Sequence, residues 1–197
     1  AREAGVELFV LDDGWFGRRD DDTSSLGDWY ADRKKLPDGI EGLSEKIRAM
    51  GLSFGLWFEP EMVNRDSRLY EAHPDWVLGS EDRPRCVGRH QLVLDFSKDE
   101  VIDYIGGLME DIIGRGHLSY IKWDMNRSIT EAWSSGRDAA YQGTVMHRQI
   151  LGVYRLYERL IRKFPHVLFE SCASGGARFD PGMLYYAPQA WTSDDTD

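Results

Sequence analysis

Short apolar runs recur along the chain, and several of them lack the polar alternation of a strand with one wet face. Six runs stand out, at residues 6–11, 53–58, 91–96, 119–123, 166–169 and 189–192. Strands that are buried on both faces are typical of parallel sheets. The pattern therefore predicts six short parallel strands.

Helical patterns fill the longer intervals between these strands. Residues 43–50 and 98–113 predict helices that end at Gly51 and Gly114, because glycine commonly follows the last turn of a helix. Residues 138–164 carry apolar side chains at helical spacing and predict a long amphipathic helix. Alternating strands and helices indicate a parallel α/β fold, either a closed barrel or an open doubly wound sheet.

Acidic residues at the strand ends favour the barrel. They are Asp12, Asp13, Glu59, Glu61, Asp95, Asp124, Glu170 and Asp194. A barrel gathers side chains from all strand ends at one mouth, whereas an open sheet concentrates its site at one switch point. We predict an incomplete (β/α)8 TIM barrel with about six of its eight βα units, in which residues 1–197 form one partial catalytic domain of a longer protein.

Composition narrows the class of partner. The chain has 34 acidic and 24 basic residues and a formal net charge of −10, which argues against nucleic acid or an anionic membrane as partner and favours a neutral small molecule. No apolar run approaches the length that spans a bilayer. Cys86 and Cys172 have neither zinc-site nor disulfide spacing, so we expect a reducing, cytoplasmic location.

The segment 122–127, Lys-Trp-Asp-Met-Asn-Arg, is the first candidate for chemistry. Lys122 and Asp124 lie two residues apart on a strand, so both point to one face and Trp123 points to the other. A carboxylate beside an ammonium group stays ionised, as a nucleophile requires, and Asn126 can contact a hydroxyl. The alternative is a structural Lys122–Asp124 ion pair, and the whole motif after a buried strand favours the catalytic interpretation.

A second candidate lies at the acidic stretch from Asp194 to Asp197. These acids could bind a cation, cap a helix or include a general acid. A general acid needs a pKa raised by apolar surroundings or by a like charge, which Asp195, Asp197 and the ring of Trp191 could supply. The residues alone leave open which of the adjacent acids donates the proton.

Two further segments read as walls of a site. Asp12 and Asp13 lie where Gly14 allows the strand to end, so both carboxylates could accept hydrogen bonds from sugar hydroxyls while Trp15 packs on the sugar ring. Their other interpretation is an ordinary loop start. Small residues at 172–176 allow a ligand close to the backbone. Residues 17–35 predict a long loop that either contacts substrate or is a solvated flap.

Five segments together resemble the α-galactosidases of glycoside hydrolase family 36 and the related raffinose and stachyose synthases. They are residues 11–16, 55–62, 120–127, 170–176 and 191–194. The resemblance implies a (β/α)8 catalytic barrel, with flanking β-rich domains in the full protein. It also implies a retaining hydrolase that cleaves terminal α-galactosyl residues of melibiose or raffinose type through a covalent intermediate, with Asp124 as nucleophile and Asp194 as acid/base.

The same resemblance implies which residues contact the sugar. Asp12 and Asp13 would hold the galactose 4- and 6-hydroxyls and so distinguish galactose from glucose. The full set of predicted substrate contacts is Asp12, Asp13, Trp57, Arg89, Lys122, Asn126, Cys172, Gly175 and Trp191. The resemblance implies no metal and no cofactor, and we expect the full-length protein to be a homo-oligomer.

Three other functions use some of the same residues. A galactosyltransferase of the raffinose-synthase type would use the same two acids but pass the sugar to another sugar. A metal-dependent phosphoesterase could use Asp12, Asp13, Asp194 and Asp195, but the sequence lacks suggestive histidine ligands and a phosphate-cradling loop. A non-catalytic sugar-binding barrel leaves Lys122 and Asp124 without a purpose.

Overall fold

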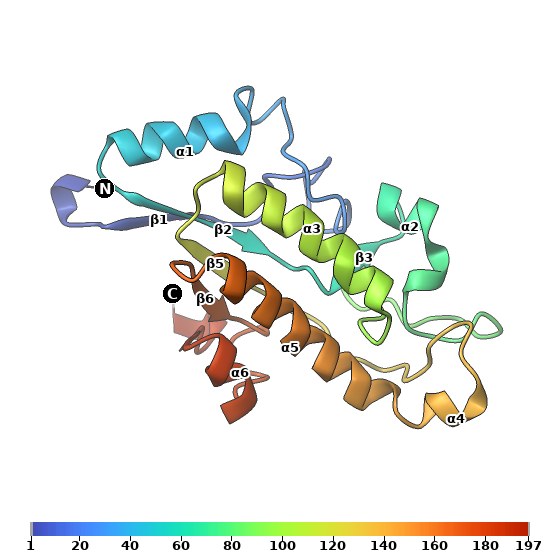
Figure 1. Ribbon diagram of the computed structural model, residues 1–197. Helices are drawn as coiled ribbons and strands as arrows, with labels where there is room; N and C mark the ends of the chain where they lie inside the picture. The colour runs from blue at the N-terminus through green and yellow to red at the C-terminus, as the bar shows by residue number, and fades with distance from the viewer. Residues whose placement is uncertain (1, 197) are drawn as a thin grey trace.

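A computed structural model of the chain describes residues 2–196 (Figure 1). Its main feature is a five-stranded parallel sheet in the order β1–β2–β5–β6–β7. The strands are β1 (Leu8–Leu11), β2 (Ser53–Phe58), β5 (Tyr120–Trp123), β6 (Leu168–Ser171) and β7 (Gln189–Ala190). Because the strands follow chain order and are parallel, their carboxyl ends meet at one edge of the sheet.

Three long helices cover one face of this sheet. They are α1 (Gly39–Ala49), α3 (Asp99–Arg115) and α5 (Val145–Lys163), and they lie beside one another with the shorter α6 (Pro181–Tyr186) next to α5 (Figure 1). Each joins successive parallel strands, which is the arrangement of consecutive βα units in a (β/α)8 barrel. The predicted parallel α/β class is confirmed, with an incomplete barrel in the described residues.

One predicted strand does not join the parallel sheet. Residues 91–96 contribute only β4 (Gln91–Val93), which pairs antiparallel with β3 (Met62–Asn64) beyond the end of β2. A parallel strand needs a crossover, usually a helix, but the segment before β4 contains only α2 (Arg68–Ala72) and the 3₁₀ turn Pro74–Trp76. The parallel strand predicted at residues 91–96 was therefore wrong, and the incomplete barrel has five parallel strands in the described residues.

Helix boundaries also differ in detail from the predictions. Gly51 follows α1 with φ +76°, as the sequence indicated, whereas Gly114 lies inside α3, which continues to Arg115. The predicted helix 138–164 divides into α4 (Ala139–Gln142) and α5. In the part of the chain described, no helix is both long and apolar enough to cross a membrane.

Close packing between α5 and the chain after β4 depends on Gly152. A Cβ at Gly152 would lie 2.0 Å from the carbonyl oxygen of Phe96, while a Cβ at Gly107 of α3 would have no neighbour within 4 Å. Helix glycine is normally destabilising relative to alanine. The two positions therefore separate the helix propensity of glycine from its role in packing.

We expect Gly152→Ala to lower the free energy of unfolding by about 1–3 kcal/mol, the usual cost of an overpacked core. Gly107→Ala should be neutral or stabilising by up to about 1 kcal/mol, because only backbone entropy changes there. Urea unfolding of the complete protein carrying each substitution measures both effects. Equal effects of the two substitutions would contradict the contact between Gly152 and Phe96.

Candidate active site

Asp124 directly follows β5 at the carboxyl end of the sheet and is 7% exposed. Its carboxylate accepts hydrogen bonds from Trp57 Nε1 at 3.1 Å, from Asn126 Nδ2 at 2.6 Å and from the backbone N–H of Met125 at 2.9 Å. Three donors fix the direction of both carboxylate oxygens. Asp124 is therefore held rigidly, as a group that must meet one atom of a bound molecule should be.

Lys122 faces the same edge but does not pair with Asp124. Its Nζ lies 2.9 Å from Asp12 Oδ2 and 4.8 Å from the centroid of the Trp191 ring. Burial lowers the pKa of Lys122, but the hydrogen bond and charge of Asp12 outweigh burial and the net pKa is raised. The alternative of a structural Lys122–Asp124 ion pair is thus not found, and Lys122 instead bridges the end of β1 and the segment after β7.

Asp12 and Asp13 lie just past the end of β1, where Gly14 has φ +97°. Their carboxylates diverge. Asp12 pairs with Lys122, and Asp13 accepts from both Nε and Nη2 of Arg19 at 2.9 and 2.8 Å. Arg19 is only 4% exposed. Each carboxylate keeps lone pairs that can accept a hydroxyl, and each is anchored by a cation.

The segment that follows β1 is a packed unit rather than a solvated flap. The aromatic residues Trp15, Phe16 and Trp29 are at most 2% exposed and pack against Phe58 or Trp57. Leu26 is buried too. Its backbone N–H donates to Asn64 Oδ1, and its carbonyl oxygen accepts from the backbone N–H of Asn64 in β3. We name residues 14–29 the aromatic loop. The flap interpretation was wrong for the buried residues 25–29, whereas residues 20–23 are exposed to solvent.

Burial also corrects the role expected of the tryptophans. Trp15 lies in the core, where it donates to the carbonyl oxygen of Trp57, so it does not offer a face to a sugar. Trp123 is fully buried and stacks on Tyr157 of α5 at 4.0 Å. Trp57 reaches Asp124 through its Nε1 atom. Trp191 is partly exposed and lies beside Lys122.

The loop after β6 forms the wall next to Asp124. Burial raises the pKa of the Cys172 thiol to about 12, and the charge and hydrogen bond of Asp124 add to this shift. The thiol is therefore uncharged at this wall, and its contact with a substrate stays a prediction. Ser174 donates from its backbone N–H and its Oγ to Asn126 Oδ1 at 3.2 and 3.1 Å. This loop and the nucleophile candidate are joined through Asn126.

Gly175 is required where this loop meets the segment after β7. It has φ +84°, and a Cβ there would lie 3.0 Å from both Ser193 Cα and Thr192 O. Any side chain would be strained in this conformation and would also press on the neighbouring backbone. The predicted site position Gly175 therefore supports the placement of the residues that lead to Asp194.

Asp194 begins the 3₁₀ turn Asp194–Thr196 and is exposed. Its Oδ1 accepts a hydrogen bond from Trp191 Nε1 at 2.9 Å, while Ser193 Oγ accepts from the backbone N–H of Asp195 at 3.0 Å. The capping function considered for Asp194 is thus performed by Ser193. The predicted influence of Asp197 lies outside the described residues.

Arg89 is the predicted contact least embedded in the site. It is exposed, has φ +53°, and precedes β4 in the loop that ends with His90. The positive charge of Arg89 opposes part of the rise in the pKa of buried Glu59. The structure thus places Arg89 at the rim of the group around Asp124, and its contact with a substrate stays a prediction.

Two buried glutamates beyond β2 complete the surroundings of Asp124, and the sequence analysis gave them no role. Glu59 accepts from the backbone N–H of Asn126 at 2.6 Å, and Glu61 accepts from Trp123 Nε1 at 2.9 Å. Arg178, after β6, pairs with Glu61 at 2.7 Å. The sequence shows only that both glutamates follow the end of a strand. It does not show which residues they contact.

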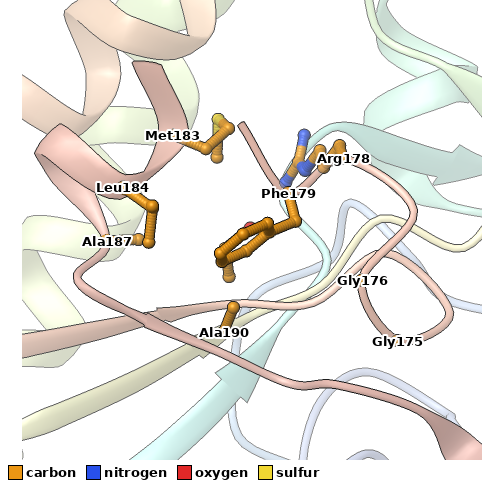
Figure 2. Close-up of a pocket in the computed structure, with 9 residues that line it drawn as sticks. Gly175, Gly176, Arg178, Phe179, Met183, Leu184, Ala187 and Ala190 are labelled. Carbon is orange, nitrogen blue, oxygen red and sulfur yellow. The ribbon is translucent and has the colours of Figure 1, made fainter. Parts of the chain in front are cut away.

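A hollow of about 300 Å³ lies beside Asn126, a size at the lower end for small-molecule sites. It is lined by Met125, Asn126, Arg127, Ser128, Ala173, Ser174, Ala177 and Arg178. A second, very small pocket of about 10 Å³ lies between the Gly175–Gly176 turn and α6, with the Phe179 ring beside Leu184 and Ala187 (Figure 2). It has room for about one water molecule, so it cannot hold a sugar.

The acids proposed for a metal site are engaged elsewhere. Asp12 and Asp13 each pair with a cationic side chain, and Asp194 binds an indole N–H. Within residues 2–196, no three His, Cys, Asp or Glu side chains are grouped so that they could hold a metal ion. The arrangement instead presents two separately held carboxylates: Asp124 is bound by Trp57 and Asn126, and Asp194 by Trp191.

Comparison with known proteins identifies close relatives. The family model described as Melibiase matches residues 1–197. The chain is 55% identical over 197 residues to alpha-galactosidase AgaA of Geobacillus stearothermophilus, an alignment that covers 100% of this chain and 27% of AgaA. The chain thus spans about a quarter of the length of this curated relative.

Solved structures give the same result. The crystal structure of the alpha-galactosidase from Lactobacillus brevis superposes with a TM-score of 0.97 at 59% identity and covers 100% of this chain and 26% of that one. The structure of an AgaA variant in complex with raffinose superposes with a TM-score of 0.97 at 54% identity, over 99% of this chain and 27% of that one.

Proposed function

Because this chain belongs to the melibiase family, we propose that it forms part of the catalytic barrel of a retaining α-galactosidase that cleaves terminal α-galactosyl residues from raffinose-type oligosaccharides. The observation that carries the proposal is the placement of Asp124, buried at the end of β5 and oriented by three donors. The relative AgaA, which shares 54% identity in that structure, binds raffinose as a variant.

In the proposed reaction, Asp124 attacks the anomeric carbon of the galactosyl unit while Asp194 protonates the leaving glycosidic oxygen. This forms a covalent β-galactosyl ester on Asp124 and releases the aglycone. Asp194, now a carboxylate, takes a proton from water, whose oxygen displaces the ester. The product keeps the α configuration, and Asp194 regains its proton.

The neighbouring cations and carboxylates suit a sugar with several hydroxyls. Lys122 holds Asp12, and Arg19 holds Asp13, so both acids are fixed before substrate arrives. We propose that they accept the galactose 4- and 6-hydroxyls, with Asn126, Cys172 and the other predicted contacts around the same ring. Because the 4-hydroxyl of glucose is equatorial and not axial, glucose would leave a charge-assisted hydrogen bond unmade, which is costly and gives selection for galactose.

The assay of this proposal compares nitrophenyl α-galactoside with the α-glucoside, using the complete protein that carries this chain. We expect hydrolysis of the galactoside alone, with the α anomer of galactose as first product by NMR. Excess sucrose as acceptor tests transfer: a predominant trisaccharide product would indicate a galactosyltransferase. A β anomer formed first would exclude a retaining mechanism.

The indole of Trp57 gives a more selective prediction. Trp57→Phe preserves an aromatic filler but removes the N–H that Asp124 accepts, a type of bond worth about 1.5–3 kcal/mol. We therefore expect kcat/KM for raffinose to fall roughly 10- to 100-fold.

Trp29→Phe is the matched control for this change. Trp29 is equally buried and packs against Trp57, but its Nε1 has no hydrogen-bond partner among the described residues. Removing that N–H should leave kcat/KM within about threefold, since no bond to the site is lost. Similar losses in both variants would show that packing, and not the bond to Asp124, accounts for the effect.

A further inference from the structure

Two glutamates leave β2 two residues apart and are equally buried, but their partners differ. Glu61 is 1% exposed and meets the guanidinium of Arg178 at 2.7 Å. Glu59 is fully buried and meets only neutral donors, Gln91 Nε2 at 3.0 Å and the backbone N–H of Asn126 at 2.6 Å. No ion pair among the described residues includes Glu59. An unpaired buried charge is costly, whereas a buried carboxylic acid is not.

The charged groups near Glu59 do not compensate for the cost of burying its negative charge. From the end of β5 comes Asp124, and from two loops come Arg89 and Arg19. Burial is the main cause that raises the pKa of Glu59 to about 8, and the charge of Asp124 acts in the same direction, against the smaller lowering by the Asn126 N–H, Arg89 and Arg19. At neutral pH, the proton therefore stays on Glu59.

We propose that Glu59 is a positioning residue that acts in its uncharged form, holding Asn126 against the nucleophile while adding no second unpaired negative charge beside Asp124. The inference rests on the proposed glycosidase function. It assigns a role to an acid that neither attacks nor protonates the substrate.

Asn126 is the residue through which Glu59 acts. Its backbone N–H donates to Glu59, its Nδ2 donates to Asp124, and its Oδ1 accepts from Ser174. Loss of the first bond frees the turn that carries the second. Displacement of a reacting group by about 1 Å can cost about 10²-fold in rate.

The neutral form also fits the contact between Glu59 and Gln91. The Oε1 atom of Gln91 is buried and has no partner among the described residues, although its Nε2 atom donates to Glu59. The amide of Gln91 can present Nε2 or, after a half-turn, Oε1 to Glu59, and only a protonated Glu59 can donate to Oε1. An ionised Glu59 has no donor to offer.

The test compares Glu59→Gln, which mimics a carboxylic acid with one donor and one acceptor, and Glu59→Ala, which has neither. In the complete protein near pH 6, we expect Glu59→Ala to lower kcat/KM for raffinose about 10²-fold and Glu59→Gln to remain within about threefold of the wild type. As pH rises through about 8, wild-type kcat/KM should fall as Glu59 loses its proton. In Glu59→Gln this fall should move to higher pH.

A second measurement does not depend on activity. The ordinary glutamate pKa is 4.5, so between that value and about 8 the folded protein holds a proton that the unfolded chain has lost. Wild-type stability should therefore decrease with pH in this window. The Tm of Glu59→Gln relative to wild type should rise from about pH 5 to about pH 8, whereas Glu61→Gln should lower Tm throughout, because it leaves Arg178 unpaired.

Two results would overturn the inference. One is equal loss of kcat/KM in Glu59→Gln and Glu59→Ala, and the other is a Tm difference for Glu59→Gln that does not change with pH. If the wild type hydrolyses no α-galactoside, the proposed function fails, but the Tm comparison still decides whether Glu59 carries a proton.

Discussion

Replacing Asp124 with glycine is expected to lower kcat for nitrophenyl α-galactoside by about 10⁴-fold or more, the order seen when a covalent nucleophile is lost. Added azide should restore turnover and yield β-galactosyl azide. The reason is geometric: the missing carboxylate leaves space on the face opposite the leaving group, and azide attacks from that face. The product configuration is read from the coupling of the anomeric proton by NMR.

The wild-type protein with azide is the control for Asp124→Gly, because an intact nucleophile fills the space and no β-azide should form. The N–H donors of Trp57 and Asn126 remain in the variant and point to the position that the carboxylate has left. They are suitable donors for an azide anion. If Asp124→Gly yielded the α-azide, the roles proposed for the two acids would be reversed.

Replacing Asp194 with alanine should have the second largest effect, and that effect should depend on the leaving group. For raffinose, whose leaving oxygen needs a proton, kcat should fall about 10²- to 10⁴-fold. For an activated nitrophenyl galactoside, the first step should be much less impaired. Azide should then intercept the covalent intermediate from the face that the leaving group vacated, giving the α-azide.

Asp195→Ala is the neighbouring control. The Asp195 side chain is exposed, and its backbone N–H, which the substitution preserves, is the group that Ser193 accepts from. Asp194, by contrast, is oriented by Trp191. We expect Asp195→Ala to retain kcat within about threefold. A larger loss from Asp195→Ala than from Asp194→Ala would assign the proton to the second acid of the pair.

Sequence patterns were sufficient for the parallel sheet because its inner strands β2, β5 and β6 are largely buried and give apolar runs without regular polar alternation. The same argument explains the error at residues 91–96. Gln91–Val93 is buried too, but in an antiparallel pair with β3. Burial alone carries no information about the partner strand. The connection before it, which contains only the short α2 and a 3₁₀ turn and no long crossover helix, was the signal that distinguishes the two cases.

The candidate site was only partly predictable for a similar reason. The position of Asp124 at a strand end follows from the sequence, but the partner of Lys122 is Asp12, 110 residues away. Local spacing favoured the wrong pair. Arg19 and Glu59 were missed because their roles arise from burial and distant contacts. The roles of the named site residues, the assignment of residues 1–197 to one partial domain, the cytoplasmic location and the homo-oligomer stay predictions.

The aromatic loop has a consequence for how substrate preference can change in this family. Residues 14–29 include Arg19, which pairs with Asp13. The same segment buries Trp15, Phe16 and Trp29 in the core and is hydrogen-bonded to β3 through Leu26. Recombination that exchanged this segment alone would mismatch the interior. A change of substrate preference here would require that residues 14–29 be exchanged together with β3 and the aromatic residues around Trp57. The other route is single substitution at the few exposed positions of the aromatic loop.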